Sequence, residues 1–74
     1  MREIAREPWS YTFTEQGPGD YILTVVCGGA GLYDYSIRLD QQQVAGYQKE
    51  GMPFILRLIE QVRFNQSPFE KQKV

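Results

Sequence analysis

Residues 21–39, YILTVVCGGAGLYDYSIRL, decide the fold that the sequence predicts. In residues 33–39 the odd positions are apolar or aromatic and the even positions are polar, a period of two that is typical of a β-strand. Both faces of residues 21–27 are fairly apolar, as expected of a central strand with a neighbour on each side. The glycine-rich residues 28–32 then connect the two strands as a hairpin loop.

A third strand is predicted upstream, at residues 9–15, WSYTFTE. Trp9, Tyr11 and Phe13 share one face, and the residues between them are serine and threonine. Residues 16–20 include Gly-Pro-Gly-Asp and read as the turn into the next strand, since proline fixes φ and glycine accepts positive φ. The three segments together predict an antiparallel meander.

The pairing register follows from the alternation of faces. Residues opposite each other in an antiparallel pair lie on the same face, so the numbers of paired residues must add to an even value unless a bulge intervenes. The predicted pairs are Phe13 with Leu23, Tyr11 with Val25, Val25 with Tyr35 and Leu23 with Ile37.

After Leu39 the period changes from strand to helix. Asp40 is a suitable N-cap for a helix over residues 41–50, and Gly51 a suitable stop. A second helix over residues 53–64 has apolar residues at helical spacing and is expected to cover the apolar sheet face. The class is therefore α+β. The predicted core consists of Trp9, Tyr11, Phe13, Leu23, Val25, Tyr35, Ile37, Ile55, Leu58, Ile59 and Val62.

The length of 74 residues predicts one small domain over residues 1–74. Residues 1–8 are charged and end in a proline, and residues 70–74 are polar, so both ends are expected to be frayed. Ser67 and Pro68 could start one further helical turn that carries Phe69.

Composition restricts the chemistry. The chain has no histidine, which removes the commonest general base and metal ligand, and one cysteine, which excludes an internal disulfide. Catalytic residues, a metal site and a cofactor are not expected. The net charge of −1 and the few basic residues disfavour nucleic acid, and no apolar run reaches the length of a membrane span. A single thiol favours the cytoplasm.

Two features are candidates for binding. The loop glycines Gly28, Gly29 and Gly31 could form a backbone anion site, although no phosphate-binding spacing is present and a strand follows the loop. Asp34 and Arg38 lie on the polar face of the strand after the loop. Cys27 falls on the inward face, where a small buried side chain is the expected role.

The function that these observations favour is a small, non-enzymatic protein-interaction module, such as a regulator, inhibitor or subunit. It would bind a protein partner or a second copy through a sheet edge or through the uncovered sheet face, where Ile22 and Val26 lie. The alternative is a small-ligand or nucleic-acid binder that uses residues 28–31 and the basic helical half, including Arg57 and Arg63.

Overall fold

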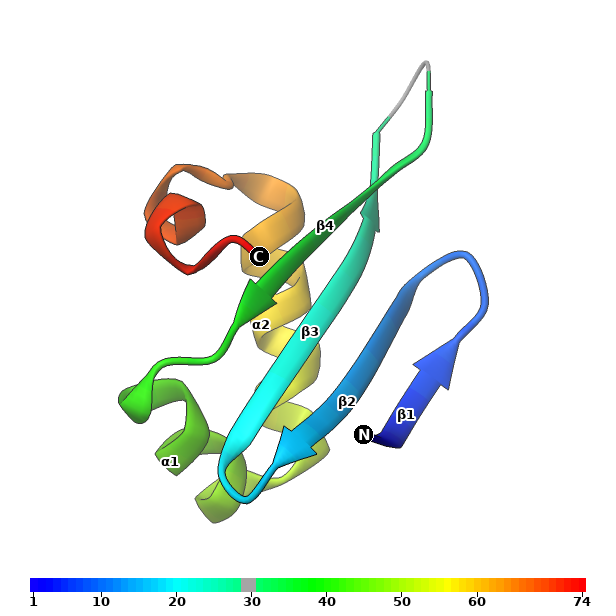
Figure 1. Ribbon diagram of the computed structural model, residues 1–74. Helices are drawn as coiled ribbons and strands as arrows, with labels where there is room; N and C mark the ends of the chain where they lie inside the picture. The colour runs from blue at the N-terminus through cyan, green and yellow to red at the C-terminus, as the bar shows by residue number, and fades with distance from the viewer. Residues whose placement is uncertain (29–30) are drawn as a thin grey trace.

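A four-stranded antiparallel sheet forms the front layer of the computed structural model, which describes residues 1–28 and 31–74 (Figure 1). The strands lie side by side in chain order. They are β1 (Arg2–Glu7), β2 (Tyr11–Gly17), β3 (Asp20–Cys27) and β4 (Tyr33–Arg38). The α+β class and the meander predicted from the sequence are confirmed, and the sheet has one strand more than predicted.

The second layer is helical. It consists of α1 (Gln41–Glu50), α2 (Met52–Phe64) and the 3₁₀ helix η1 (Ser67–Gln72). Figure 1 shows α2 running behind the sheet, with α1 below it and η1 beside β4. The buried residues of α2 are Ile55, Leu58, Ile59 and Val62, so the predicted apolar stripe is the one that covers the sheet. No described helix covers the opposite face, which we call the open face.

The prediction that residues 1–8 are frayed is wrong, because Arg2–Glu7 form β1 and pair with β2. The pairing shifts by one residue between Glu3 and Ala5, which is a β-bulge. The bulge lets two consecutive residues, Ile4 and Ala5, both pack against the core. Consecutive apolar residues do not alternate, so the strand pattern was hidden in the sequence.

Trp9 is also placed differently from the prediction. It lies in the turn between β1 and β2, with a φ of 63° and 82% of its surface exposed. The Ser10 amide donates to the Glu7 carbonyl at 2.9 Å and closes this turn. Because β1 and β2 are antiparallel neighbours, the chain reverses direction between them. Trp9 lies in this turn and is therefore outside the core.

The predicted register is confirmed at every pair. Phe13 lies opposite Leu23, Tyr11 opposite Val25, Val25 opposite Tyr35 and Leu23 opposite Ile37. The first loop is shorter than the predicted residues 16–20, because Gly17 pairs with Asp20 after a shift that follows Glu15. The second loop spans residues 28–32 as predicted, and its residues 29–30 lie outside the described part of the chain.

An aromatic cluster joins α1 to the sheet within the core. Phe13 stacks on Tyr21 with ring centroids 5.4 Å apart, and Tyr47 of α1 meets Phe13 edge-on at 5.0 Å. Tyr11, which was predicted to be in the core, is half-buried and packs at its margin. The buried apolar residues are Phe13, Tyr21, Leu23, Val25, Cys27, Tyr35, Ile37, Leu39, Ile55, Leu58, Ile59, Val62 and Phe69.

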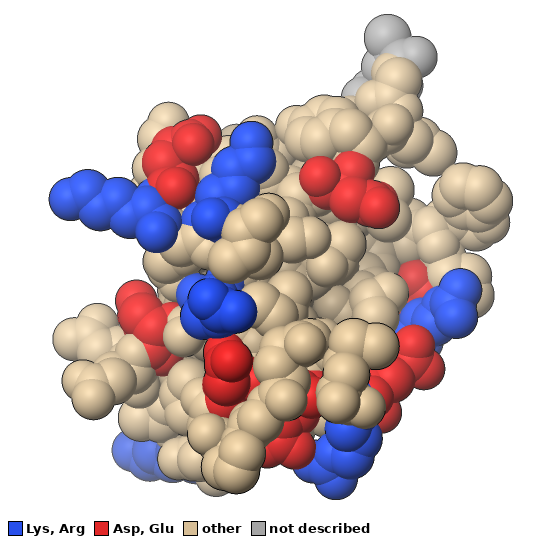
Figure 2. All heavy atoms as spheres, in the orientation of Figure 1, with Lys and Arg blue, Asp and Glu red and all other residues tan. Residues whose placement is uncertain are grey.

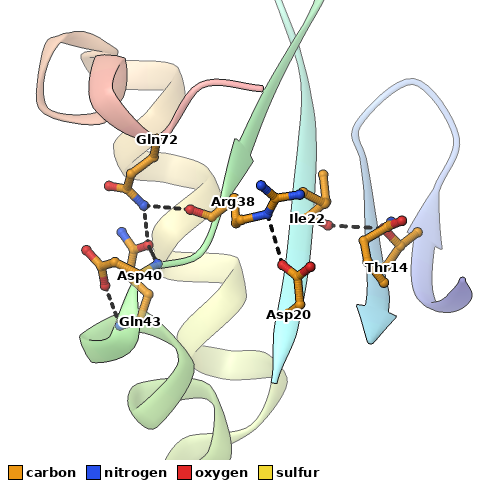
Figure 3. Close-up of polar contacts among 8 residues, drawn as sticks. Thr14, Asp20, Ile22, Arg38, Asp40, Gln43 and Gln72 are labelled. Carbon is orange, nitrogen blue, oxygen red and sulfur yellow. Dashed lines mark hydrogen bonds and ion pairs between the residues drawn. The ribbon is translucent and has the colours of Figure 1, made fainter. Parts of the chain in front are cut away.

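The helix boundaries have local causes. Asp40 caps α1 by accepting a hydrogen bond from the Gln43 amide, and the Gln43 side chain accepts one from the Asp40 amide (Figure 3). Gly46 inside α1 lies against the ring of Phe54, where an ideal Cβ would stand 2.3 Å from a ring carbon. The close approach of the two helices explains a glycine at a helical position that would otherwise favour alanine.

The C-terminal residues are ordered against β4, which corrects the prediction of a frayed tail over residues 70–74. Lys73 forms an isolated bridge with Ile37, and the Val74 amide donates to the Ser36 carbonyl at 3.0 Å. The Gln72 side chain donates to the Arg38 carbonyl at 3.0 Å (Figure 3). The predicted turn carrying Phe69 is confirmed as η1, and burial of Phe69 fixes the tail in this position.

Two buried tyrosines make the stability of this fold sensitive to alkaline pH. Burial raises the pKa of Tyr21 above its usual value of 10.0, and the nearby Glu15 carboxylate raises it further. Burial also raises the pKa of Tyr35. A raised pKa in the folded state means that the folded protein holds the proton more tightly, so the stabilisation present below pH 10 is lost as the pH rises through the folded-state pKa.

We therefore expect the urea midpoint to fall between about pH 9 and about pH 11, and to fall less in Tyr21→Phe than in the wild type. Tyr33→Phe is the matched control, since Tyr33 is 48% exposed. An equal fall in the wild type and in Tyr21→Phe would contradict the assignment.

Candidate functional site

The candidate binding residues from the sequence are spread along the hairpin of β3 and β4. Gly28 and Gly31 belong to the loop, Asp34 lies beside the loop opposite Val26, and Arg38 lies at the far end of β4 opposite Ile22. Gly29 lies outside the described residues. The structure therefore does not gather the predicted set into one site.

Arg38 has a structural partner on the open face. Its guanidinium donates to the Asp20 carboxylate at 2.9 Å, from β4 to the start of β3 (Figure 3). Both side chains are well exposed, so this ion pair contributes little to stability. The ion pair joins the end of β4 to the beginning of β3.

Gly28 is required by the loop itself. Its φ is +115°, and an ideal Cβ at this position would lie 2.1 Å from the Gly31 carbonyl oxygen. A side chain would strain the backbone and collide with it, so glycine is explained here without a ligand. Apart from its chain neighbours, no residue that the structure describes lies within 4 Å of the ideal Cβ position of Gly31.

The two glycines give a matched pair of substitutions. Gly28→Ala should lower the free energy of unfolding by about 2 kcal/mol, because it adds both a disfavoured φ and a backbone clash. Gly31→Ala should change it by less than about 0.5 kcal/mol. Urea denaturation of both variants measures the two changes. Equal effects would show that the positive φ and the close approach of the Gly31 carbonyl do not explain the glycine at position 28.

A hollow of about 440 Å³ lies at the base of this loop. It is lined by Val26, Cys27, Gly28, Tyr33, Arg63 and Gln66. The structure thus brings Arg63 of the basic helical half next to Gly28, as the ligand-binding alternative requires. Arg57 does not join them, because it forms an ion pair with Glu50.

The polar groups of the hollow already have partners within the protein. The Arg63 guanidinium donates to the Ser10 side-chain oxygen at 2.8 Å and to the Ser10 carbonyl at 3.1 Å. The Tyr33 hydroxyl donates to the Gln66 side chain at 3.3 Å. The buried Cys27 thiol donates to the Val25 carbonyl at 3.6 Å, as expected of a small core residue. The bonds of Arg63 and Gln66 tie α2 and the segment after it to Ser10 and to the start of β4.

The open face is a small surface rich in hydroxyl groups. Thr24 and Ser36 share a hydrogen bond of 2.8 Å, and the Thr14 hydroxyl donates to the Ile22 carbonyl at 3.4 Å. Figure 2 shows this face: uncharged side chains fill the area over the middle of β2 and β3, and most charged side chains lie toward the margins. The apolar residues predicted there, Ile22 and Val26, are half-buried by their neighbours.

The two edges of the sheet differ in what covers them. The outer side of β4 is occupied by the tail at Ser36, Ile37 and Arg38, through the contacts of Gln72, Lys73 and Val74 described above. No described segment pairs with the outer side of β1. The predicted edge at residues 9–15 is an inner strand, so the available edge is six residues that the sequence did not identify as a strand.

Comparison of the chain with protein-family models, with curated proteins and with solved structures finds no match. The proposals below are therefore based on the physical features of the chain.

Two further properties bear on the kind of site. Within residues 1–28 and 31–74, no three His, Cys, Asp or Glu side chains lie close enough together to hold a metal ion. None of the described helices has the length and apolar character needed to cross a membrane. The remaining candidate surfaces are the β1 edge, the open face and the hollow beside Gly28.

Proposed function

We propose that this chain is a small, non-enzymatic protein-interaction module that binds a protein partner through the outer edge of β1. The supporting observation is the difference between the two sheet edges. The tail pairs with β4, whereas among the described residues β1 has a neighbour on one side only.

Strand addition suits such an edge. An unpaired edge presents a row of amide and carbonyl groups, and an added strand gains hydrogen bonds from them while its side chains provide selectivity. The β1 edge carries Arg2, Glu3, Arg6 and Glu7, all exposed. Charges of both signs favour a partner strand with the opposite charge order and disfavour apolar strands.

The chemistry of the chain supports binding rather than catalysis. Histidine is absent from the sequence, the one thiol is buried, and near the hollow Tyr33 bonds to Gln66 while Arg63 bonds to Ser10. We place this role in the cytoplasm, because a lone reduced cysteine suits a reducing compartment.

Affinity capture from native lysate tests the proposal when wild type is compared with variants of the edge. Arg6→Glu reverses an exposed charge on β1, and Lys71→Glu makes the same change on η1 as the control. We expect a partner retained by wild type and Lys71→Glu to be lost with Arg6→Glu. Addition of that partner should slow amide hydrogen exchange in β1. Equal retention by all three proteins, with unchanged exchange in β1, would contradict the proposal.

The alternative is a small anionic ligand or a short nucleic acid at the hollow, which is favoured by the proximity of Gly28 and Arg63. NMR titration with nucleotides and with single-stranded DNA tests it. Shifts at Gly28, Tyr33 and Arg63 would support the alternative, and their absence at millimolar ligand would exclude it.

A further inference from the structure

The charge order of β1 is complementary to itself. Its sequence is REIARE, and reversal gives ERAIER, so an antiparallel copy places an opposite charge at each charged position. Arg2 faces Glu7 of the second copy, and Glu3 faces Arg6. Ile4 faces Ala5 at the centre. Each of these contacts occurs twice across a two-fold axis.

The bulge in β1 makes this register compatible with the faces of the sheet. Arg2, Ala5 and Glu7 pair with Glu15, Phe13 and Tyr11, which lie on the helix-covered face, while Glu3 and Arg6 pair with Thr14 and Thr12 of the open face. Ile4 packs on the core beside Ala5. Every pair of the self-complementary register therefore joins residues of the same face, as antiparallel pairing requires.

Neighbouring registers fail on both charge and face. A shift by one residue in one direction places Arg2 opposite Arg6, and a shift in the other places Glu3 opposite Glu7. In both cases like charges meet, and the two side chains belong to different faces. The order of charges and the position of the bulge therefore both favour the register in which Arg2 faces Glu7 and Glu3 faces Arg6.

We propose that the partner strand at this edge is β1 of a second copy, paired in an antiparallel manner about a two-fold axis between Ile4 and Ala5. The inference rests on the proposed function and names the partner. Four strands from each copy then form one continuous sheet, with both open faces on the same side.

The ion pairs of the dimer extend a contact already present in the monomer. Arg2 donates to the Glu15 carboxylate at 2.7 Å, and its side chain is 72% exposed. A guanidinium has five N–H donors, so Arg2 can hold Glu15 and Glu7 of the second copy together. On the open face Glu3 and Arg6 lie opposite Thr14 and Thr12, and neither has an ion pair within residues 1–28 and 31–74, which leaves both charges for the second copy.

The turn after β1 provides a reporter for the pairing. Trp9 is the only tryptophan and is 82% exposed, and antiparallel pairing brings it near the first residues of the second copy. Dilution of the dimer should therefore shift the tryptophan emission to longer wavelength. The protein concentration at the midpoint of this shift should equal the concentration at which the average molecular mass is halfway between monomer and dimer.

Charge exchange between two residues of the open face tests the register. Glu3→Arg and Arg6→Glu each create two like-charge pairs in a homodimer, so each variant alone should dimerise at least about tenfold more weakly than wild type. In a mixed dimer of the two variants, the two substituted positions face each other with opposite charges. The unchanged Arg6 of one chain likewise faces the unchanged Glu3 of the other. The mixture should therefore dimerise like wild type in sedimentation equilibrium. Both substitutions are at exposed positions, and circular dichroism verifies that each variant is folded.

Control variants distinguish the effect of charge pairing in the proposed register from the effect of a change in net charge. Glu60→Arg and Lys71→Glu carry the same charge changes on α2 and η1, and they should dimerise as wild type does. A wild-type protein that stays monomeric at high micromolar concentration would overturn the proposal, as would a mixture no stronger than the single variants. Loss of a different captured protein on Arg6→Glu, with a monomeric wild type, would leave the proposed function standing. A monomeric wild type, together with no captured protein lost on Arg6→Glu, would overturn both the dimer and the proposed function.

Discussion

Phe13→Ala should lower the free energy of unfolding by about 4 kcal/mol, the largest effect expected of a single substitution in this chain. The Phe13 side chain is fully buried and its ring contacts Tyr21 of β3 and Tyr47 of α1. A chain of this length has a total stability on the order of 4–11 kcal/mol, so the variant should be partly unfolded at 37 °C. Urea denaturation followed by circular dichroism measures the change.

Matched substitutions distinguish the effect of burial on stability from the effect of removing an aromatic ring at any position. Phe64→Ala removes the same atoms from a side chain that is 93% exposed, and it should change stability by less than about 0.5 kcal/mol. Phe13→Leu keeps most of the buried volume and should fall between the two. A cost below about 1 kcal/mol for Phe13→Ala would show that the aromatic cluster does not hold α1 against the sheet.

The central hairpins were predictable because one physical rule fixes their pairing. A one-residue slip would move Leu23 and Val25 out of the core, so only registers of one parity were allowed. The predicted pairs Phe13–Leu23 and Val25–Tyr35 obey this rule, and the structure confirms them. The helix over residues 53–64 was equally clear, because its four apolar residues recur at a single helical spacing.

The first strand was missed because its signal is irregular. Ile4 and Ala5 are consecutive, and only a bulge brings both to the core. Pro8 indicates the end of a helix or strand but does not say which, and Trp9 continues the alternation of residues 11–15 although it belongs to a turn. The order of charges in residues 2–7 was available in the sequence. It became informative only once the segment was known to be an edge strand.

The candidate sites depend on contacts between distant parts of the chain. Arg63 reaches Ser10 across 53 positions, so the hollow beside Gly28 has no local sequence signal. Asp34 and Arg38 share a face in the sequence pattern, as predicted, but share no site. Which edge is open depends on the tail, and a polar tail gives no indication that it will pair with β4.

Phe69→Ala is the second substitution with a large expected effect, a loss of about 3 kcal/mol. Phe69 is buried in the core and holds η1 against β4. Tyr35 adds two weak contacts: its hydroxyl donates to the Gln66 carbonyl at 3.4 Å, and the Lys73 ammonium lies 5.3 Å from the centre of its ring. Without the Phe69 ring, these contacts and the hydrogen bonds of Gln72 and Val74 to β4 are too weak to keep residues 67–74 on the sheet. Lys71→Ala, an exposed neighbour in η1, is the control and should change stability by less than about 0.5 kcal/mol.

Detachment of the tail should also change how the protein associates. While the tail pairs with residues 36–38 of β4, the proposed pairing through β1 closes at two copies. When the tail leaves, the carbonyls of Ser36 and Arg38 become free on a second edge, and strand addition can continue in both directions. Phe69→Ala should therefore form species larger than a dimer in light scattering, and should exchange the Val74 amide rapidly. A variant that loses the expected stability yet stays no larger than wild type would show that the tail contributes packing without limiting association.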